Sequence, residues 1–257
     1  MMGIINVTPD SFFAAGRTER VDAAIARGQA HFDAGASIVD VGGESSRPGA
    51  VSVPADVEIA RVVPVIEALS HMGRVSVDTV KPEVAAAAVE AGASLINDVS
   101  GSLAGTAAAL GVGWVAMHAK GTPATMQDNP TYDDVVAEVS VWLDAKAHEA
   151  ASLGVGELWL DPGIGFAKTF DHNWSLLRHG DELAALAHER GARFLIGTSR
   201  KRFLGEIGGH DLAPEDRLAA SIATAVAAMS AGADVVRCHD VEATVQAARV
   251  FSEKMET

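Results

Sequence analysis

Polar and charged side chains recur at the ends of short apolar runs in this sequence. Those with the clearest chemical potential are Asn6, Asp78, Asn97, Asp161, Lys201, Arg237 and His239. If these groups converge, carboxylate and amide acceptors would lie beside an ammonium donor. A flat heterocycle with an aminopyrimidine edge presents the complementary pattern. A buried site of this kind rejects rings without the matching groups, because its own polar groups would lose their partners.

A second set of groups suits a diphosphate. Arg47, Arg237 and His239 are potential donors, and Asn6 ends the first apolar run. Such donors bind phosphate oxygens, which Mg²⁺ commonly bridges. Asn6 is therefore the candidate metal ligand, although one amide alone does not make a metal site. The alternative for Arg237 and His239 is a surface pair that flanks a turn.

Strand geometry excludes two residues, Cys238 and Asp98, that lie next to these candidates in the sequence. Side chains alternate between the two faces of a strand. Cys238 therefore points away from its two neighbours, toward the helices, and is expected to pack rather than to react. By the same count Asp98 turns away from Asn97, and we expect it only to cap the following turn. For Asp78 the alternative is a structural carboxylate at a strand end.

The composition excludes several classes of protein. The chain has 257 residues, of which 48% are hydrophobic and 21% charged, unlike a disordered chain. Its single cysteine has no partner for an intrachain disulfide. A formal charge of −14 argues against a nucleic acid or an acidic membrane surface as partner. No apolar run approaches the ~18 residues of a membrane span, and no signal-peptide pattern opens the chain, so we expect a cytoplasmic protein.

Eight short runs rich in β-branched residues precede these polar groups, and we predict that they are strands. They are residues 3–6, 37–41, 74–78, 94–98, 114–118, 157–161, 193–199 and 234–239. The intervening segments have helical spacing, most weakly at 103–110. These predicted helices are residues 21–32, 57–69, 82–91, 103–110, 132–151, 174–188, 217–229 and 241–251.

Glycine joints support this alternation of helix and strand. Gly35, Gly92 and Gly232 each precede an apolar strand, where glycine supplies the left-handed residue that ends a helix. Alternating strands and helices predict parallel pairing. We therefore predict one α/β domain over residues 1–257, a (β/α)8 TIM barrel with its active site at the carboxyl ends of the strands. The alternative, an open doubly wound sheet, usually carries a G-x-G-x-x-G turn after its first strand, and none follows Asn6.

Motifs follow the predicted strands in a fixed order. They are Asn6–Phe12 (NVTPDSF), Asp40–Gly49 (DVGGESSRPG), Asp78-Thr79, Asn97–Gly101 (NDVSG), Met117-His118 with Gly121–Gln127 (GTPATMQ), Asp161–Thr169 (DPGIGFAKT), Ser199–Gly205 (SRKRFLG) and Arg237–Asp240 (RCHD). This ordered set resembles the dihydropteroate synthases, the pterin-binding enzymes of folate biosynthesis. The resemblance extends from Gly3 to about Val250.

The resemblance implies a reaction and its ligands. A (7,8-dihydropterin-6-yl)methyl diphosphate would lose Mg²⁺-bound diphosphate in an SN1-like step, and 4-aminobenzoate would attack to give 7,8-dihydropteroate. The implied cofactor is Mg²⁺, and sulfonamides, which mimic the benzoate, are the implied inhibitors. Members of the family commonly form homodimers, and we expect one here, with the alanine-rich segment 217–229 packed against its twin.

The resemblance also assigns roles to residues. The implied pterin-binding residues are Asp78, Asn97, Met117, Asp161, Phe166, Gly197 and Lys201. The implied aminobenzoate-binding residues are Ser46, Arg47, Pro48 and Ser199. Diphosphate would bind Asn6, Arg47, Arg237 and His239, with Asn6 as the metal ligand, and the catalytic residues would be Asn6, Asp78, Lys201 and Arg237. The alternative for Ser199 is a helix N-cap. The loops 42–50 and 121–127 are candidate lids, or else ordinary connectors.

Two other functions stay open. A methyltetrahydrofolate:corrinoid methyltransferase would need the pterin residues but has no reason to keep the diphosphate set. A paralogue that binds pterin without turnover is the other alternative. Its support is the segment Phe13–Gly16 (FAAG), where the family usually has Ser-Asp-Gly-Gly. Turnover of both substrates with release of diphosphate would separate an active synthase from this paralogue.

Overall fold

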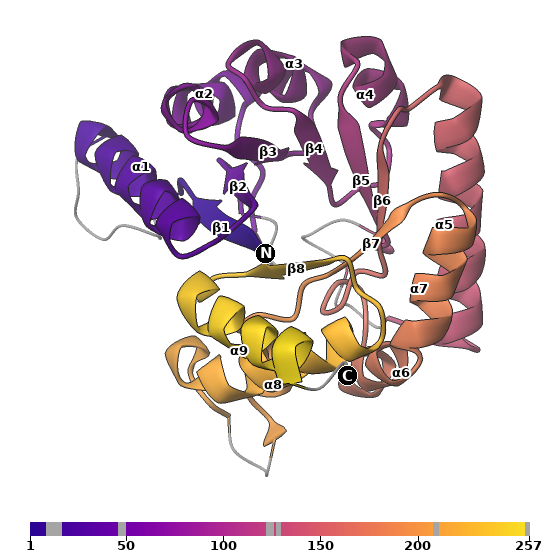
Figure 1. Ribbon diagram of the computed structural model, residues 1–257. Helices are drawn as coiled ribbons and strands as arrows, with labels where there is room; N and C mark the ends of the chain where they lie inside the picture. Colours follow the sequence, from indigo (N-terminus) through magenta and orange to yellow (C-terminus); the bar gives the residue numbers. More distant parts are fainter. Residues whose placement is uncertain (9–16, 46–49, 122–125, 127–129, 208–210, 255–257) are drawn as a thin grey trace.

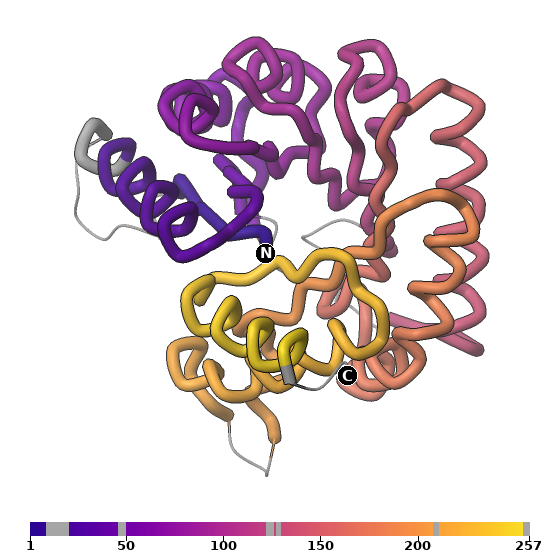
Figure 2. The backbone as a smooth tube through the Cα atoms, in the orientation of Figure 1, coloured from indigo at the N-terminus to yellow at the C-terminus, as the bar shows by residue number. Residues whose placement is uncertain are grey.

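A closed barrel of eight parallel strands forms the centre of the protein. The computed structural model describes residues 1–8, 17–45, 50–121, 126, 130–207 and 211–254. The strands are β1 (Met2–Asn6), β2 (Ile38–Gly42), β3 (Arg74–Asp78), β4 (Leu95–Asp98), β5 (Gly113–Met117), β6 (Leu158–Asp161), β7 (Arg193–Ile196) and β8 (Val235–Cys238). They follow one another in sequence order, and β8 pairs with β1 to close the ring (Figure 2). The predicted barrel is confirmed, and the open sheet is excluded.

Helices surround the barrel on its outside (Figure 1). They are α1 (Arg17–Asp33), α2 (Ala55–Ser70), α3 (Pro82–Glu90), α4 (Ala104–Leu110), α5 (Val135–Leu153), α6 (Phe170–Arg178), α7 (Gly180–Glu189), α8 (Leu218–Ser230) and α9 (Val241–Lys254), with short 3-10 helices at η2 (Arg202–Leu204) and η4 (Pro214–Arg217). The glycine joints are confirmed, since Gly35, Gly92 and Gly232 have φ angles of 99°, 109° and 93°. None of the helices in the described ranges is long and apolar enough to span a membrane.

Most predicted elements differ from the structure by a few residues at their ends, and two of the differences matter for the site and its surroundings. The helix expected over residues 174–188 is two helices, α6 and α7, separated by His179, whose φ of −107° and ψ of 27° are not helical. The strand expected over 193–199 ends at Ile196, where its pairing with β8 stops. Gly197 and Ser199 therefore belong to the loop that leaves the barrel.

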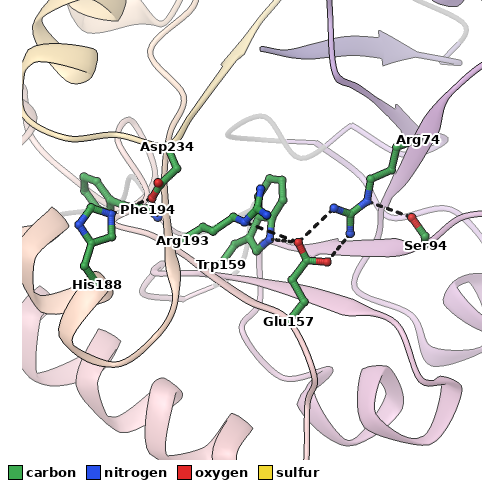
Figure 3. Close-up of polar contacts among 8 residues, drawn as sticks. All are labelled: Arg74, Ser94, Glu157, Trp159, His188, Arg193, Phe194 and Asp234. Atoms are coloured by element: carbon green, nitrogen blue, oxygen red, sulfur yellow. Dashed lines mark hydrogen bonds and ion pairs between the residues drawn. The ribbon is translucent and has the colours of Figure 1, made fainter. Parts of the chain in front are cut away.

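The interior of the barrel is apolar at mid-height and polar at both ends. Its buried apolar cluster consists of Met2, Ile38, Leu95, Val115, Trp159, Leu195 and Val235. At the amino-terminal end of the strands, Arg74 makes two hydrogen bonds to the carboxylate of Glu157, at 3.0 and 2.5 Å (Figure 3). The indole of Trp159 donates to the same carboxylate at 2.9 Å. The guanidinium groups of Arg74 and Arg193 lie 5.6 and 5.5 Å from the centre of the indole. This cluster closes the floor, opposite the end where the candidate active site lies.

The floor cluster allows a stability prediction. The hydrogen bonds from Arg74 outweigh partial burial and lower the pKa of Glu157. A lowered carboxyl pKa stabilises the folded state above the pKa of the unfolded chain, and the effect disappears as the pH falls through the folded pKa. Glu157→Gln should therefore lower the unfolding free energy at pH 7 by about 1–2 kcal/mol, with the difference shrinking below about pH 4. Thermal melts at pH 7 and pH 3.5 measure it.

A matched control removes a carboxylate from an exposed ion pair. Lys146 and Glu149 pair at 2.7 Å one turn apart on α5, with Glu149 39% exposed. Glu149→Gln should leave the melting temperature within about 1 °C, since exposed pairs contribute little. Equal shifts in the two variants would show that the floor cluster adds nothing.

Candidate active site

Buried polar side chains line the carboxyl-terminal end of the barrel. The register of the strands aligns Asn6 with Gly42, Gly42 with Asp78, and Asp78 with Asn97, so these residues lie at one level. Further round the barrel, Met117 aligns with Asp161. Asp78, Asn97 and Asp161 are 8%, 4% and 4% exposed. Polar groups buried to this degree are usually hydrogen-bonded, and most of these groups find partners within the site.

Arg237 is the centre of the first group of contacts. Its Nη2 donates to Oδ2 of Asp78 at 2.8 Å, and its Nε donates to Oδ2 of Asp40 at 2.7 Å. The amide of Asn97 donates to the same Asp40 oxygen at 2.8 Å. One guanidinium thus serves two buried carboxylates. Burial, opposed by Arg237 and reinforced by Asp40, raises the pKa of Asp78 to about 7. The alternative in which Arg237 belongs to a surface pair is wrong.

Asp40 begins one of the motifs at the strand ends, but the sequence predicted no role for it in the site. It is fully buried, and it links β2 to β4 through Asn97 and to β8 through Arg237. Its Oδ1, like Oγ of neighbouring Ser76, is buried without a hydrogen-bond partner in the described part of the chain. Strand alternation could have indicated that Asp40 points into the barrel, because Asp40 lies two residues after Ile38 and shares its inward face. Its contact with Arg237 could not be anticipated, because the two residues are 197 positions apart.

Asp161 and Lys201 form the opposite wall. The carboxylate of Asp161 accepts from the backbone N–H of Gly163 at 2.7 Å. Nζ of Lys201 donates to the carbonyl of Ile164 and lies 4.7 Å from the centre of the Phe166 ring. Burial, partly offset by Asp161, lowers the pKa of Lys201 to about 8. Burial also raises the pKa of Asp161. The wall therefore holds a carboxylate together with an ammonium group that lies beside an aromatic ring.

Gly197 joins the two walls. A methyl group on Gly197 would lie 3.6 Å from Cβ of Arg237 and 3.9 Å from Nζ of Lys201. The charges of Arg237 and Asp78 also act on Lys201. Met117, which is 3% exposed, ends the strand beside Asp161. The structure thus brings the predicted pterin residues to one end of the barrel.

The turn after β7 is tied to the end of β8. Oγ of Ser199 lies 3.1 Å from Nδ1 of His239 and accepts from the backbone N–H of His239 at 3.1 Å. Arg200, held at a positive φ of 59°, makes two hydrogen bonds to the carboxylate of Asp240. Lys201, not Ser199, is the N-cap of the helix that follows, and no side chain caps it. The alternative in which Ser199 is a helix N-cap is therefore wrong.

Asp98 and Cys238 have the structural roles expected of them. The carboxylate of Asp98 accepts hydrogen bonds from the backbone N–H groups of Ser100, Ser102 and Leu103, and from the indole of Trp114. It therefore caps the turn after β4. Cys238 is 3% exposed and belongs to the core between barrel and helices. Neither prediction needs revision.

Asn6 is the one predicted metal ligand, and it lies at the carboxyl end of β1, partly exposed. No group of three or more His, Cys, Asp or Glu residues that could hold a metal occurs among the described residues. Mg²⁺ usually keeps several water ligands and takes others from substrate phosphates. The donor set therefore fits an ion carried by a diphosphate rather than one held by protein alone.

Other predicted site residues have no described structure. Ser46, Arg47 and Pro48, predicted to contact the second substrate, lie outside the described residues. The departing segment 13–16 also lies outside them, as does most of the loop 121–127. Their predicted roles stay predictions.

Comparison with known proteins gives the class of this chain. The profile of the family described as "Pterin binding enzyme" matches residues 2–239. The dihydropteroate synthase of Mycobacterium leprae is 45% identical over 263 residues, which cover 97% of this chain and 91% of the relative.

Solved structures agree with the family match. Dihydropteroate synthase of Xanthomonas albilineans with 4-aminobenzoic acid has a TM-score of 0.91 at 44% identity, covering all of this chain and 93% of that one. The same enzyme in complex with 7,8-dihydropteroate has a TM-score of 0.87 at 42% identity, with the same coverage. The Yersinia pestis enzyme in a sulfonamide drug complex has a TM-score of 0.91 at 38% identity, covering 100% of this chain and 94% of that one.

Fold and site together define a (β/α)8 barrel enzyme with a buried polar site at the carboxyl ends of its strands. The chain belongs to the pterin-binding enzyme family and, within it, to the dihydropteroate synthases, which are transferases.

Proposed function

We propose that this enzyme joins (7,8-dihydropterin-6-yl)methyl diphosphate to 4-aminobenzoate and releases 7,8-dihydropteroate and diphosphate. The observation that carries the proposal is the buried arrangement in which Asp78 and Arg237 face Asp161 and Lys201. Carboxylates that accept from the amino and ring N–H groups of a pterin, with an ammonium donor opposite, match both edges of that ring. The family membership supports the same substrates.

The residues would divide the work of an SN1-like reaction. Asp78, Asn97, Asp161 and Lys201 would hold the pterin, with Met117, Phe166 and Gly197 against its faces. The carboxylate of Asp78 would stabilise positive charge that spreads from the methylene carbon into the ring as the carbon–oxygen bond breaks. The aniline nitrogen would then form the carbon–nitrogen bond and release a proton. This scheme requires no covalent enzyme intermediate.

The leaving group would be held by the opposite side of the rim. Arg237, His239, Arg47 and Asn6 would donate to the diphosphate, and Asn6 would also hold Mg²⁺ together with the diphosphate oxygens. When bound, the ion would neutralise charge on the departing oxygens. Ser199, with Ser46, Arg47 and Pro48, would contact the aminobenzoate. Sulfonamides would compete for that place, and the related Yersinia pestis enzyme forms a complex with a sulfonamide drug.

Assembly and location belong to the same proposal. The alanine-rich helix α8 would pack against its twin in a homodimer. The buried free thiol of Cys238 is consistent with a reducing cytoplasm. Light scattering at micromolar concentration tests the dimer, and a monomer there would contradict it.

Turnover separates the synthase from its alternatives. With both substrates and Mg²⁺, we expect one diphosphate released for each dihydropteroate formed, and no release without 4-aminobenzoate beyond slow hydrolysis. Binding of pterin with no turnover would leave the non-catalytic paralogue as the better account. Methyl transfer from methyltetrahydrofolate to a corrinoid would instead identify the methyltransferase class.

The pH dependence of pterin affinity follows from two side chains. Ionised Asp78 accepts from the ring, so affinity should rise up to about pH 7, where Asp78 ionises. It should fall above about pH 8, as Lys201 loses its proton. Each outer limb should approach a tenfold change per pH unit. Calorimetric titration from pH 5.5 to 9.5 measures the profile. Lys201→Arg should remove the alkaline limb, because arginine stays protonated; a limb that persists would assign it to another group.

A further inference from the structure

The loop between β6 and α6 holds one alanine, Ala167, in a backbone conformation that its side chain disfavours. Three of its residues have positive φ angles, 69° at Gly163, 83° at Gly165 and 51° at Ala167. A left-handed conformation costs a residue with a side chain about 1–2 kcal/mol, and it persists only where the surroundings impose it. Contacts from outside the loop must therefore hold Ala167 in place.

Lys168 supplies several of those contacts. Its side chain is 2% exposed, although lysine is rarely buried to this degree. Nζ lies 3.0 Å from Nδ1 of His118 and 3.0 Å from the carbonyl of Phe166, to which it donates. A longer contact, 3.4 Å, reaches the carbonyl of His118. One amine thus ties the loop to the end of β5.

His118 is built to accept from Lys168. Burial first, and then the charge of Lys168, lower the pKa of His118 to about 3, so the ring is neutral. Nδ1 therefore accepts a hydrogen bond from Nζ of Lys168, and the ring packs edge-on against Trp142, with centroids 5.2 Å apart. A methyl group on Gly163 would lie 1.8 Å from the carbonyl oxygen of His118. Loop and strand are in close contact on this side.

A second contact holds the loop from the side of α5. The hydroxyl of Tyr132 donates to the carbonyl of Ala167 at 3.0 Å. On its inner side the loop presents the carbonyl of Ile164 to Lys201 and the Phe166 ring 4.7 Å from the same ammonium group. Lys168 therefore holds the outer side of the β6–α6 loop, and the inner side of the same loop forms one wall of the site.

We propose that Lys168 is a positioning residue of the pterin site, which holds the β6–α6 loop against His118 so that Phe166 and the Ile164 carbonyl stay in register with Lys201. The inference rests on the proposed pterin substrate and adds to it a residue outside the first layer of contacts. A methionine would fill the same volume without the cost of burying an amine. The hydrogen bonds of Lys168 are thus the reason for a lysine at this position.

Lys168→Met tests the proposal. Loss of the hydrogen bonds to Phe166 and His118 should weaken pterin binding about 10-fold or more, measured as Kd by calorimetry and as KM for the pterin diphosphate. The KM for 4-aminobenzoate should change less than about twofold, because the loop lies on the pterin side. A loss of folded protein would lower the apparent kcat and leave both KM values unchanged, so a selective rise in the KM for the pterin distinguishes positioning from folding.

Two further variants make the test specific. Arg190→Met removes a cationic side chain from an exposed ion pair with Asp144, outside this network of contacts, and it should leave both KM values unchanged. Tyr132→Phe removes only the hydroxyl that reaches Ala167. It should weaken pterin binding about threefold with the fold intact, which keeps the test decisive if Lys168→Met does not fold.

The outcomes separate this inference from the proposed function. Wild-type protein that binds pterin, together with Lys168→Met and Tyr132→Phe proteins that bind it equally well, would overturn the role of Lys168 alone. Wild-type protein that binds no pterin would overturn both. A selective rise in the pterin Kd of both variants, with Arg190→Met unchanged, is the expected result.

Discussion

Asp78→Asn should abolish most pterin binding while making the ligand-free protein more stable. The carboxylate shares Arg237 with Asp40, and burial raises its pKa to about 7. A hydrogen bond to a charged group contributes about 1.5–3 kcal/mol, so losing two acceptor contacts to the ring should weaken binding about 100-fold or more. Calorimetric titration of a pterin ligand measures this loss.

The stability gain has a definite pH dependence. A raised carboxyl pKa means that the folded state holds the proton more tightly than the unfolded chain. Stability is therefore lost as the pH rises from about 4, the unfolded value, to about 7. The asparagine variant does not lose stability in this way, because its side chain does not ionise. Its melting temperature should exceed that of the wild type at pH 8 by several degrees, at about 2–4 °C per kcal/mol, and the difference should vanish at pH 4. A less stable variant at pH 8 would show that the Asp78–Arg237 pair outweighs the burial of the carboxylate.

Arg237→Met should cause the largest loss of stability. It leaves Asp78 and Asp40 buried without their shared cation, and removing one partner of a buried pair costs about 3–5 kcal/mol. Chemical denaturation at pH 8 measures the change. Turnover should fall below detection, since the same guanidinium is proposed to stabilise the leaving diphosphate.

The double variant Arg237→Met with Asp40→Asn separates these two effects, because Asp40 has no proposed contact with the pterin. It removes one of the two orphaned carboxylates and should recover part of the stability but none of the turnover. If the single variant were as stable as the wild type, the two carboxylates would not depend on Arg237. If turnover returned with stability, the role of Arg237 would be structural only.

Strand ends were the part of the site most accessible to sequence reasoning. In a parallel barrel the end of every strand reaches the same rim, so Asp78, Asn97 and Asp161 could be placed together from their positions alone. The alternation of side chains also placed Cys238 and Asp98 correctly outside the site. These predictions need only the positions of the strand ends and the two-residue alternation of side chains, and both can be read from the sequence.

The sequence could not predict the roles of residues that depend on contacts between distant strands and loops. Asp40 matters because it meets Arg237, 197 residues away, and Lys168 because it meets His118, 50 residues away. Neither partner can be read from residue spacing. The division between α6 and α7 is similar, since the backbone at His179 departs from the helix within a segment whose apolar spacing continues.

Location of a bound pterin in a crystal structure is the most direct test of the account. The ring should lie at the carboxyl end of the barrel, with hydrogen bonds to Asp78 and Asp161 and to Nζ of Lys201. A ring bound elsewhere, for example in the apolar groove lined by Met229, Val245 and Phe251, would contradict it.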